Sequence, residues 1–362
     1  MGNNNSKRNG LIDLERIIFA IMIILLHSKN YRESIMPNGY IAVEFFFVVS
    51  GYLLAKKAEN YKGTDIWNDN IRFLWRKYLS IFPYLIVSII FGIVLYRHYI
   101  PSDDTVFMTI LKAFVDYFPL QMFGFAGIII SGVSWYLCLL FFCTFVLFPI
   151  LVTKREVFVK YFAPIIVLFC YGLIVKNSDN YRVSSVWYGV VYSGVLRGYA
   201  GMCLGVISYE ARKKLDSLKA TSTNIAVVTA TPIAFIIFTV WFAFQGIELN
   251  ILTVLFVPLM CLLVATSFSS KNIISKLLEG PVCEFFGKFS LSIFLCHYYI
   301  ANLMPWFAED LMSNRATATY FVVVFAISIV NYILGKLLIY KRTRKPVAGI
   351  LVLSVVLANF FL

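Results

Sequence analysis

The sequence predicts an all-α polytopic integral membrane protein with about ten core transmembrane helices and a possible short C-terminal eleventh. Of its 362 residues, 60% are hydrophobic and only 14% are charged. Soluble domains are about 45–50% apolar and about 25% charged. Apolar runs recur along the chain, and each approaches the roughly 20 residues that a membrane-spanning helix needs. This composition excludes an ordinary soluble domain.

Ten apolar runs predict the core helices. They lie near residues 11–30, 39–56, 79–98, 132–152, 157–175, 186–207, 224–244, 250–268, 285–305 and 318–340. A basic stretch and a last apolar run, 347–362, follow them. We therefore divide the chain into a membrane domain, 1–340, and a tail, 341–362. No internal repeat of fixed period is visible.

The basic residues indicate orientation. Most Lys and Arg lie between the apolar runs, as in cytoplasmic loops. Lys7 and Arg8 precede the first run, so we expect a cytoplasmic N-terminus in the plasma (inner) membrane. The later basic clusters also lie on the cytoplasmic side only if residues 105–131 cross the membrane an even number of times. We predict that this segment is re-entrant or lies flat on the outer face. The net charge of +13 thus indicates topology rather than a nucleic-acid partner.

The seven cysteines lie in or beside apolar runs and form no C-x-x-C pattern. This distribution is typical of small buried side chains rather than of disulfides or metal ligands. We expect no bound metal.

Ionisable residues stand inside the first two apolar runs. Asp13, Glu15, Arg16 and His27 lie in the first run, and Glu44 opens the second. Such residues are costly and rare within a membrane, so each is a functional candidate. A helix rises 1.5 Å per residue, which puts His27 roughly 16 Å deeper than Arg16. The second run returns from the outer side, so Glu44 should reach a depth similar to that of His27.

Two motifs in these runs resemble the membrane acyltransferase-3 family. Ten residues separate Arg16 from His27, and Glu44-Phe45-Phe46 precedes Ser50-Gly51-Tyr52. The family more often has Asp at the acidic position. The resemblance implies an O-acyltransferase that moves an acyl group from acetyl-CoA or another acyl-CoA. The acceptor it implies is a hydroxyl of a cell-surface glycan or a lipid-linked sugar.

Three later stretches are similar to further motifs of that family. Arg72 and Arg76 stand ahead of a proline, and Trp135 belongs to a Ser-Trp-Tyr-Leu sequence. A Gly-x-x-Ser sequence precedes His297. The chain departs from the family at Leu140, where many members have glutamate, and this puts the usual role of that helix in doubt.

The acyl transfer implied by the resemblance needs a base, because a sugar hydroxyl is a poor nucleophile. Histidine suits that task at neutral pH. We interpret His27 as the general base and Glu44 as the carboxylate that orients it, with Asp13 as the less favoured orienter. The alternative is that His27 is a structural polar residue that bonds to a neighbouring helix. The sequence does not distinguish direct transfer from a covalent acyl-enzyme.

The donor implied by the resemblance carries phosphates, for which arginine is the best side chain. We expect Arg16, Arg72 and Arg76 to bind it at the cytoplasmic face. The last two could instead be ordinary cytoplasmic anchors. The extended pantetheine arm is comparable in length to the separation of Arg16 and His27.

Weaker candidates for substrate binding are scattered along the chain. They are Asp13, Ser50, Trp135, Arg197 and His297. Arg197 could bind acceptor or donor, or pair with a carboxylate, and His297 could be structural or line the acceptor site. The expected partners are acyl-CoA, a carbohydrate or lipid-linked sugar, and membrane lipid. A transporter or flippase of an anionic or sugar-lipid substrate is the main alternative function, and a catalytically silent membrane sensor is another.

Overall fold

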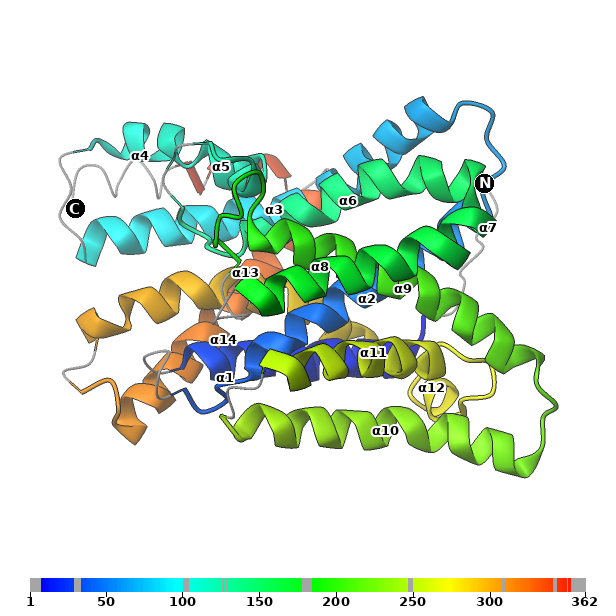
Figure 1. The fold of residues 1–362 in the computed structure, drawn as a ribbon. Coiled ribbons are helices and arrows are strands. Elements are labelled where there is room, and N and C mark those ends of the chain that lie inside the picture. The colour runs from blue at the N-terminus through cyan, green and yellow to red at the C-terminus, as the bar shows by residue number, and fades with distance from the viewer. Residues whose placement is uncertain are drawn as a thin grey trace. The chain divides into compact units, whose positions relative to one another are not determined.

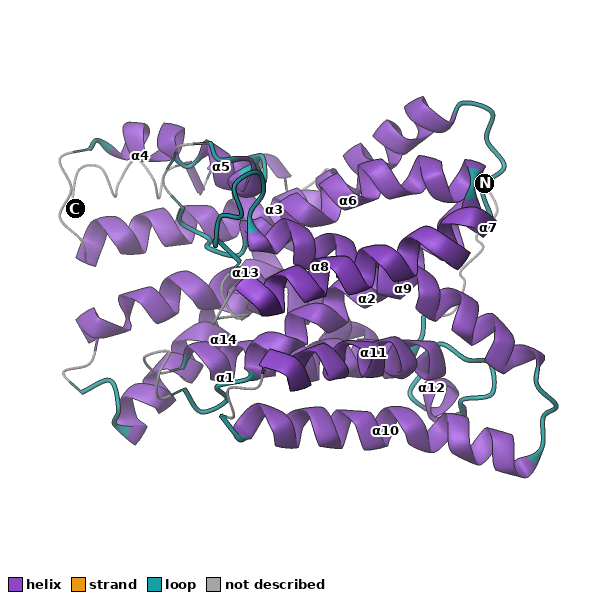
Figure 2. Ribbon diagram, viewed as in Figure 1, coloured by secondary structure: helices purple, strands orange, loops and turns teal. Residues whose placement is uncertain are grey.

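The computed structural model describes most of the chain. The described residues are 8–28, 34–99, 104–125, 127, 129–177, 184–246, 250–307, 310–340, 344–349 and 351–352. Within these ranges the chain is helical and has no strand, apart from a single bridge between Trp187 and Tyr192 (Figure 2). Each of the ten apolar runs contains a helix, which confirms the all-α prediction.

The chain divides into two compact units. The first comprises Met1–Ile23, Met36–Ile66 and Cys143–Ser290, and the second comprises Ile24–Ile35, Trp67–Phe142 and Leu291–Leu362. Four helices contribute residues to both: α1 (Gly10–His27), α6 (Ser134–Thr153), α13 (Pro281–Phe307) and, by its first residue alone, α3 (Ile66–Tyr99).

In the first unit, the helices pack around α9 (Ser193–Ser217). Helix α2 (Ala42–Glu59), α8 (Ala163–Asn177) and α11 (Asn250–Ser267) all contact α9. Helix α10 (Ser222–Phe244) lies beside α11 (Figure 1). The unit also holds η1 (Gly39–Ile41), α7 (Arg155–Val157), η3 (Phe158–Phe162) and α12 (Ile273–Leu277).

Glycines bring the backbones of α2 and α9 into direct contact. A Cβ atom at Gly51 would lie 2.0 Å from the Met202 carbonyl oxygen, and one at Gly205 would lie 2.1 Å from that of Val48. Small residues permit this close approach between membrane helices. The contact fixes α2 against α9, the two helices that carry Glu44 and Arg197.

We expect Gly205→Ala to lower the free energy of unfolding by about 3 kcal/mol, because the new methyl group would meet backbone atoms that cannot move aside. Gly172→Ala is the matched control, since a Cβ atom at Gly172 would have no neighbour within 4 Å. The measurement is thermal stability of the detergent-solubilised protein. Equal stability of the two variants would contradict the close contact.

In the second unit, α3 (Ile66–Tyr99) is longer than predicted. It begins 13 residues before residue 79, because the polar and basic residues ahead of the apolar run continue the same helix. Its 34 residues span about 51 Å, against roughly 30 Å for the hydrocarbon core of a bilayer. The first turns of α3, which carry Arg72 and Arg76, therefore extend beyond the apolar part of the helix.

The segment from 105 to 131 contains only short helices in the part that the structure describes. They are α4 (Val106–Lys112), α5 (Phe114–Tyr117) and η2 (Gln121–Phe123). None is long enough to cross a bilayer, which agrees with the prediction that the segment is not a clean span.

Asp116 ties this segment to the start of α6. Its fully buried carboxylate accepts hydrogen bonds from the backbone N–H groups of Ile130 (2.6 Å) and Ser131 (2.9 Å) and from the Ser134 hydroxyl. Burial raises the pKa of Asp116, and these hydrogen bonds oppose that increase. The Ser of the Ser-Trp motif thus anchors the preceding loop.

The last helix of the core, α14 (Asn314–Ile339), packs with the C-terminal tail in the second unit. Val347 and Leu351 join a cluster with Val87 of α3, and Leu334 and Leu337 pack against it. Residues 350 and 353–362 lie outside the described residues, so a spanning eleventh helix over 347–362 stays a prediction.

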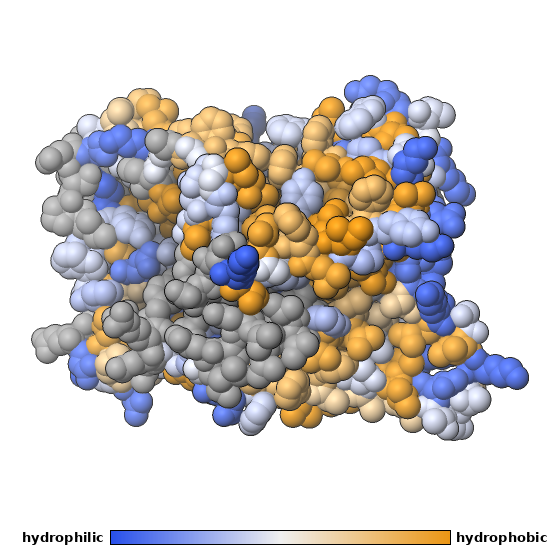
Figure 3. Space-filling model, viewed as in Figure 1, coloured by the Kyte–Doolittle hydropathy of each residue, from blue (hydrophilic) through white to orange (hydrophobic). Residues whose placement is uncertain are grey.

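Six helices among the described residues are long and apolar enough to cross a membrane. They are Gly39–Glu59, Ile66–Tyr99, Ser134–Thr153, Arg155–Lys176, Ser222–Phe244 and Asn314–Ile339. The expectation of about ten spans is thus supported for six. Helix α1 is not among these six, because three of its 18 residues, Asp13, Glu15 and Arg16, are charged. In Figure 3, apolar side chains cover α8 and α10, and hydrophilic ones gather near α7 and the connection from α9 to α10.

The predicted start of the sixth run was wrong. We expected a helix from residue 186, but α9 begins at Ser193. Residues 186–192 form a turn instead, in which the N–H of Tyr188 donates to the carbonyl of Val191 (2.9 Å) and that of Ser193 to Val186 (2.8 Å). Apolar composition alone did not distinguish this turn from a helix.

Candidate functional site

Glu44 is the centre of a buried polar cluster in the first unit. It lies in the first turn of α2, where a helix N-terminus favours a negative charge, and it is fully buried. Arg197 on α9 donates from Nε to Glu44 Oε1 at 2.8 Å, and its Nη2 forms an ion pair with the same oxygen, also at 2.8 Å. The hydroxyl of Tyr171 on α8 donates to Oε2 at 2.5 Å. One carboxylate therefore joins three helices.

Arg197 is only 1% exposed, so its charge requires compensation inside the protein. The ion pair with Glu44 supplies it, and Nη2 also lies 3.4 Å from the Tyr40 carbonyl. Of the roles that the sequence left open for Arg197, pairing with a carboxylate is the one that the structure shows. Tyr171 was missed, because a single tyrosine within an apolar run matches no motif.

Asp13 and Arg16 lie together near the start of α1. Arg8 donates to Asp13 from Nε (2.8 Å) and Nη2 (2.5 Å), and Arg16 Nη1 lies 3.5 Å from Oδ1. Two guanidinium groups thus lie against one carboxylate. A Cβ atom at Gly287 would lie 2.2 Å from Asp13 Oδ1, so the glycine of the late motif lets α13 approach Asp13.

Glu15 is a further buried carboxylate, to which the sequence motifs assign no role. It is fully buried in α1, and the hydroxyl of Ser267 donates to it at 2.5 Å. Its position within the charged opening of the first apolar run was the available signal.

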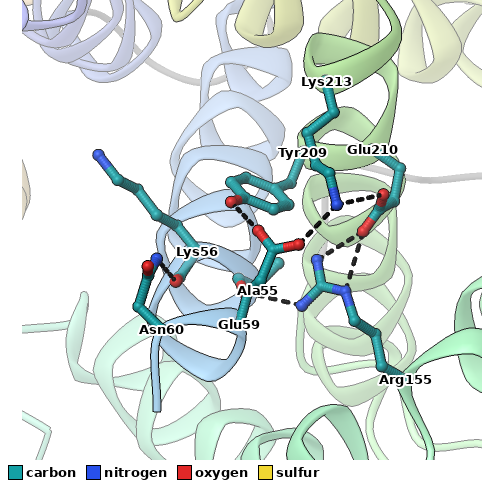
Figure 4. Close-up of polar contacts among 8 residues, drawn as sticks. All are labelled: Ala55, Lys56, Glu59, Asn60, Arg155, Tyr209, Glu210 and Lys213. Carbon is teal, nitrogen blue, oxygen red and sulfur yellow. Dashed lines mark hydrogen bonds and ion pairs between the residues drawn. The ribbon is translucent and has the colours of Figure 1, made fainter. Parts of the chain in front are cut away.

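The basic cluster where α2, α7 and α9 meet is already paired with carboxylates (Figure 4). Arg155 donates to Glu210 at 2.5 and 3.0 Å and to the Ala55 carbonyl at 3.0 Å. Lys213 donates to Glu59 at 2.5 Å, and the hydroxyl of Tyr209 donates to the same carboxylate. This network holds the three helices together, and its cations are engaged within the protein.

His27 lies at the end of α1, in the second unit. Its ring centroid is 5.2 Å from that of His297 on α13 and 5.4 Å from that of Tyr298, whose ring is nearly perpendicular to it. His297 is fully buried, and its Nδ1 lies 2.8 Å from the Phe294 carbonyl. Two sequence candidates that stand 270 residues apart are therefore neighbours. Tyr298 was missed, although it directly follows His297.

The remaining candidates lie apart from these clusters or at the surface. Arg72 is exposed and lies 3.7 Å from Asp69, and Arg76 is exposed with no carboxylate partner in the described ranges. Ser50 is half-buried on α2, and Trp135 is half-buried in the first turn of α6. Within the described parts of the chain, no group of three or more His, Cys, Asp or Glu is placed to hold a metal ion.

The comparison with protein families decides the identity of the chain. A family model described as an acyltransferase domain matches residues 9–335. The chain belongs to the acyltransferase-3 family. Searches of curated proteins and of solved structures gave no match. The family match confirms the resemblance, since it spans both N-terminal motifs and the late Gly-x-x-Ser motif. Together with its apolar helices, it identifies a multi-pass membrane acyltransferase.

Proposed function

We propose that this acyltransferase is an acyl-CoA-dependent O-acyltransferase. It moves an acyl group, with acetyl the simplest case, to a hydroxyl of a cell-surface glycan or lipid-linked sugar. The observation that carries the proposal is the family match over 9–335, within which His27 stands beside the fully buried His297. The basic clusters between the apolar runs support a cytoplasmic N-terminus. We also propose a plasma-membrane location and a membrane domain over residues 1–340.

His27 acts as the general base in this proposal. The imidazole takes the hydroxyl proton as the hydroxyl oxygen attacks the thioester carbonyl carbon. The carbon–sulfur bond then breaks, and the departing thiolate takes the proton from the imidazolium. No covalent acyl-enzyme is needed for this sequence of steps.

Glu44 remains our proposed orienter of His27. Its carboxylate accepts hydrogen bonds from Arg197 and Tyr171 in the structure. Asp13 suits the role less well, because 14 residues of one helix, or about 21 Å, separate it from His27.

The donor's phosphates are assigned to Arg16, with Arg72 and Arg76 as further candidates. The position of Arg16 beside Arg8 near the start of α1 supports this, whereas Arg155 and Lys213 pair with Glu210 and Glu59 (Figure 4). Asp13, Ser50, Trp135, Arg197 and His297 remain candidates for substrate contact.

We expect Arg16→Ala to raise the apparent KM for acetyl-CoA by roughly 10- to 100-fold, because a hydrogen bond to a charged group contributes about 1.5–3 kcal/mol. The turnover number should change much less. Arg315→Ala, which removes an exposed arginine at the start of α14, serves as the control. An unchanged KM in the Arg16 variant would contradict the donor assignment, provided that KM reflects affinity.

The test of the function is an assay of the purified full-length chain. With acetyl-CoA and an acceptor glycan, it should release free thiol and form a product heavier by one acetyl group. Transport of the glycan without thiol release would instead support a transporter. Release of thiol at the same rate without acceptor would indicate hydrolysis of the donor and contradict transfer.

A further inference from the structure

His297 presents a buried hydrogen-bond acceptor that the proposed mechanism does not use. Its Nδ1 lies 2.8 Å from the Phe294 carbonyl and 3.3 Å from that of Ile293. A carbonyl oxygen only accepts, so Nδ1 carries the proton, and Nε2 of the neutral ring is then an acceptor. Nε2 is buried and has no hydrogen-bond partner in the part of the chain that the structure describes.

The imidazole ring that carries Nε2 lies next to that of His27. The two imidazole centroids are 5.2 Å apart, and Tyr298 lies edge-on to His27. The loop before α6 also reaches this place, since a Cβ atom at Gly132 would lie 1.9 Å from Tyr298 Cδ1. The end of α1, the loop before α6 and α13 thus converge around the two histidines, all within the second unit.

A purely structural role does not account for Nε2. The bond from Nδ1 to the Phe294 carbonyl already fixes the ring, and an apolar side chain could fill the same space. A buried polar atom without a partner costs about 1–3 kcal/mol, so its persistence calls for an explanation such as a ligand. The ligand must donate a hydrogen bond.

We propose that His297 Nε2 accepts a hydrogen bond from a second hydroxyl of the acceptor, while His27 takes the proton of the hydroxyl that is acylated. This inference rests on the proposed function and deepens it. One hydroxyl has one proton, so two adjacent imidazole acceptors require two donors. The acceptor is therefore a polyol with neighbouring hydroxyls, as in a sugar ring, and not a simple alcohol. His297 is a positioning and specificity-determining residue that exchanges no proton.

The test compares matched acceptors with matched variants. The acceptors are methyl glucopyranoside, methyl mannopyranoside and methyl galactopyranoside, each with monodeoxy analogues that lack a hydroxyl next to the acylated one. In His297→Asn the shorter amide can still donate to the Phe294 carbonyl, but nothing replaces Nε2. In His297→Gln the longer amide places an acceptor near the position of Nε2.

For the unmodified chain, we expect kcat/KM for the full glycoside to exceed that for its deoxy analogue by roughly 10- to 100-fold, since loss of the donor leaves Nε2 unpaired. His297→Asn should reduce this ratio to about one and leave the deoxy acceptor almost unaffected. His297→Gln should retain most of the ratio. The KM for acetyl-CoA should stay the same in all three proteins.

Two other outcomes would overturn the inference alone, and a third would overturn the proposed function as well. Equal losses on full and deoxy acceptors in His297→Asn would show a structural role and overturn this inference, while the proposed function would stand. Retention of the ratio by Asn but not by Gln would also overturn it. An unmodified chain that releases no thiol with any of these glycosides would overturn the proposed function and, with it, the inference.

Discussion

Replacement of His27 by alanine is expected to lower kcat/KM for acyl transfer by roughly 10²- to 10⁴-fold, the usual contribution of a positioned general base. The physical reason is that the attacking hydroxyl would lose the group that takes its proton. Thiol release and acetylated product, measured together, provide the readout. The KM for acetyl-CoA should change little, because the donor's phosphates contact other residues in this proposal.

The chain has only three histidines, which makes a clean control available. His98 is exposed near the end of α3, where its ring lies against that of Tyr99. His98→Ala should keep full activity. The His27 variant should also elute from size exclusion as the unmodified protein does, since His27 is only half-buried. A folded His27→Ala protein with normal activity would refute the general-base assignment.

The sequence was sufficient for the helices and for the motifs, because both depend on local composition and spacing. Each apolar run contains a helix, and the family match covers the motif residues. The ends of the helices were less predictable, because a polar stretch can continue a helix and an apolar stretch can form a turn. Helix α3 continues through the polar residues before its apolar run, whereas the apolar residues 186–192 form a turn.

Contacts between helices could not be predicted. The sequence shows which ionisable residues lie inside apolar runs, where they are costly, but it does not show which helices contact one another. Glu44 and Arg197 are 153 residues apart, and no motif connects them. The glycines at 51 and 205 hint at close packing, but their partners emerge only from the fold. The expected pairing of His27 with Glu44 stays a prediction.

The Glu44–Arg197 ion pair gives the largest expected effect on stability. Arg197→Met should lower the free energy of unfolding by about 3–5 kcal/mol, because it leaves the Glu44 carboxylate buried without its counter-charge. Glu44→Gln should have a similar effect, since it leaves Arg197 uncompensated. Tyr171→Phe removes one hydrogen bond to the same carboxylate and should cost about 1 kcal/mol. Unfolding of the purified protein in detergent is the measurement.

The double variant Glu44→Gln with Arg197→Met separates structure from chemistry. Removal of both charges should restore much of the stability that either single change loses, since no buried charge remains without a partner. Additive losses would contradict the ion pair as the origin of the effect. If Glu44 serves only to neutralise Arg197, the restored protein should also recover acyl transfer. If Glu44 orients His27, as we propose, the restored protein should remain folded and have low activity, because the imidazole would lack the carboxylate that fixes its tautomer and stabilises its charge.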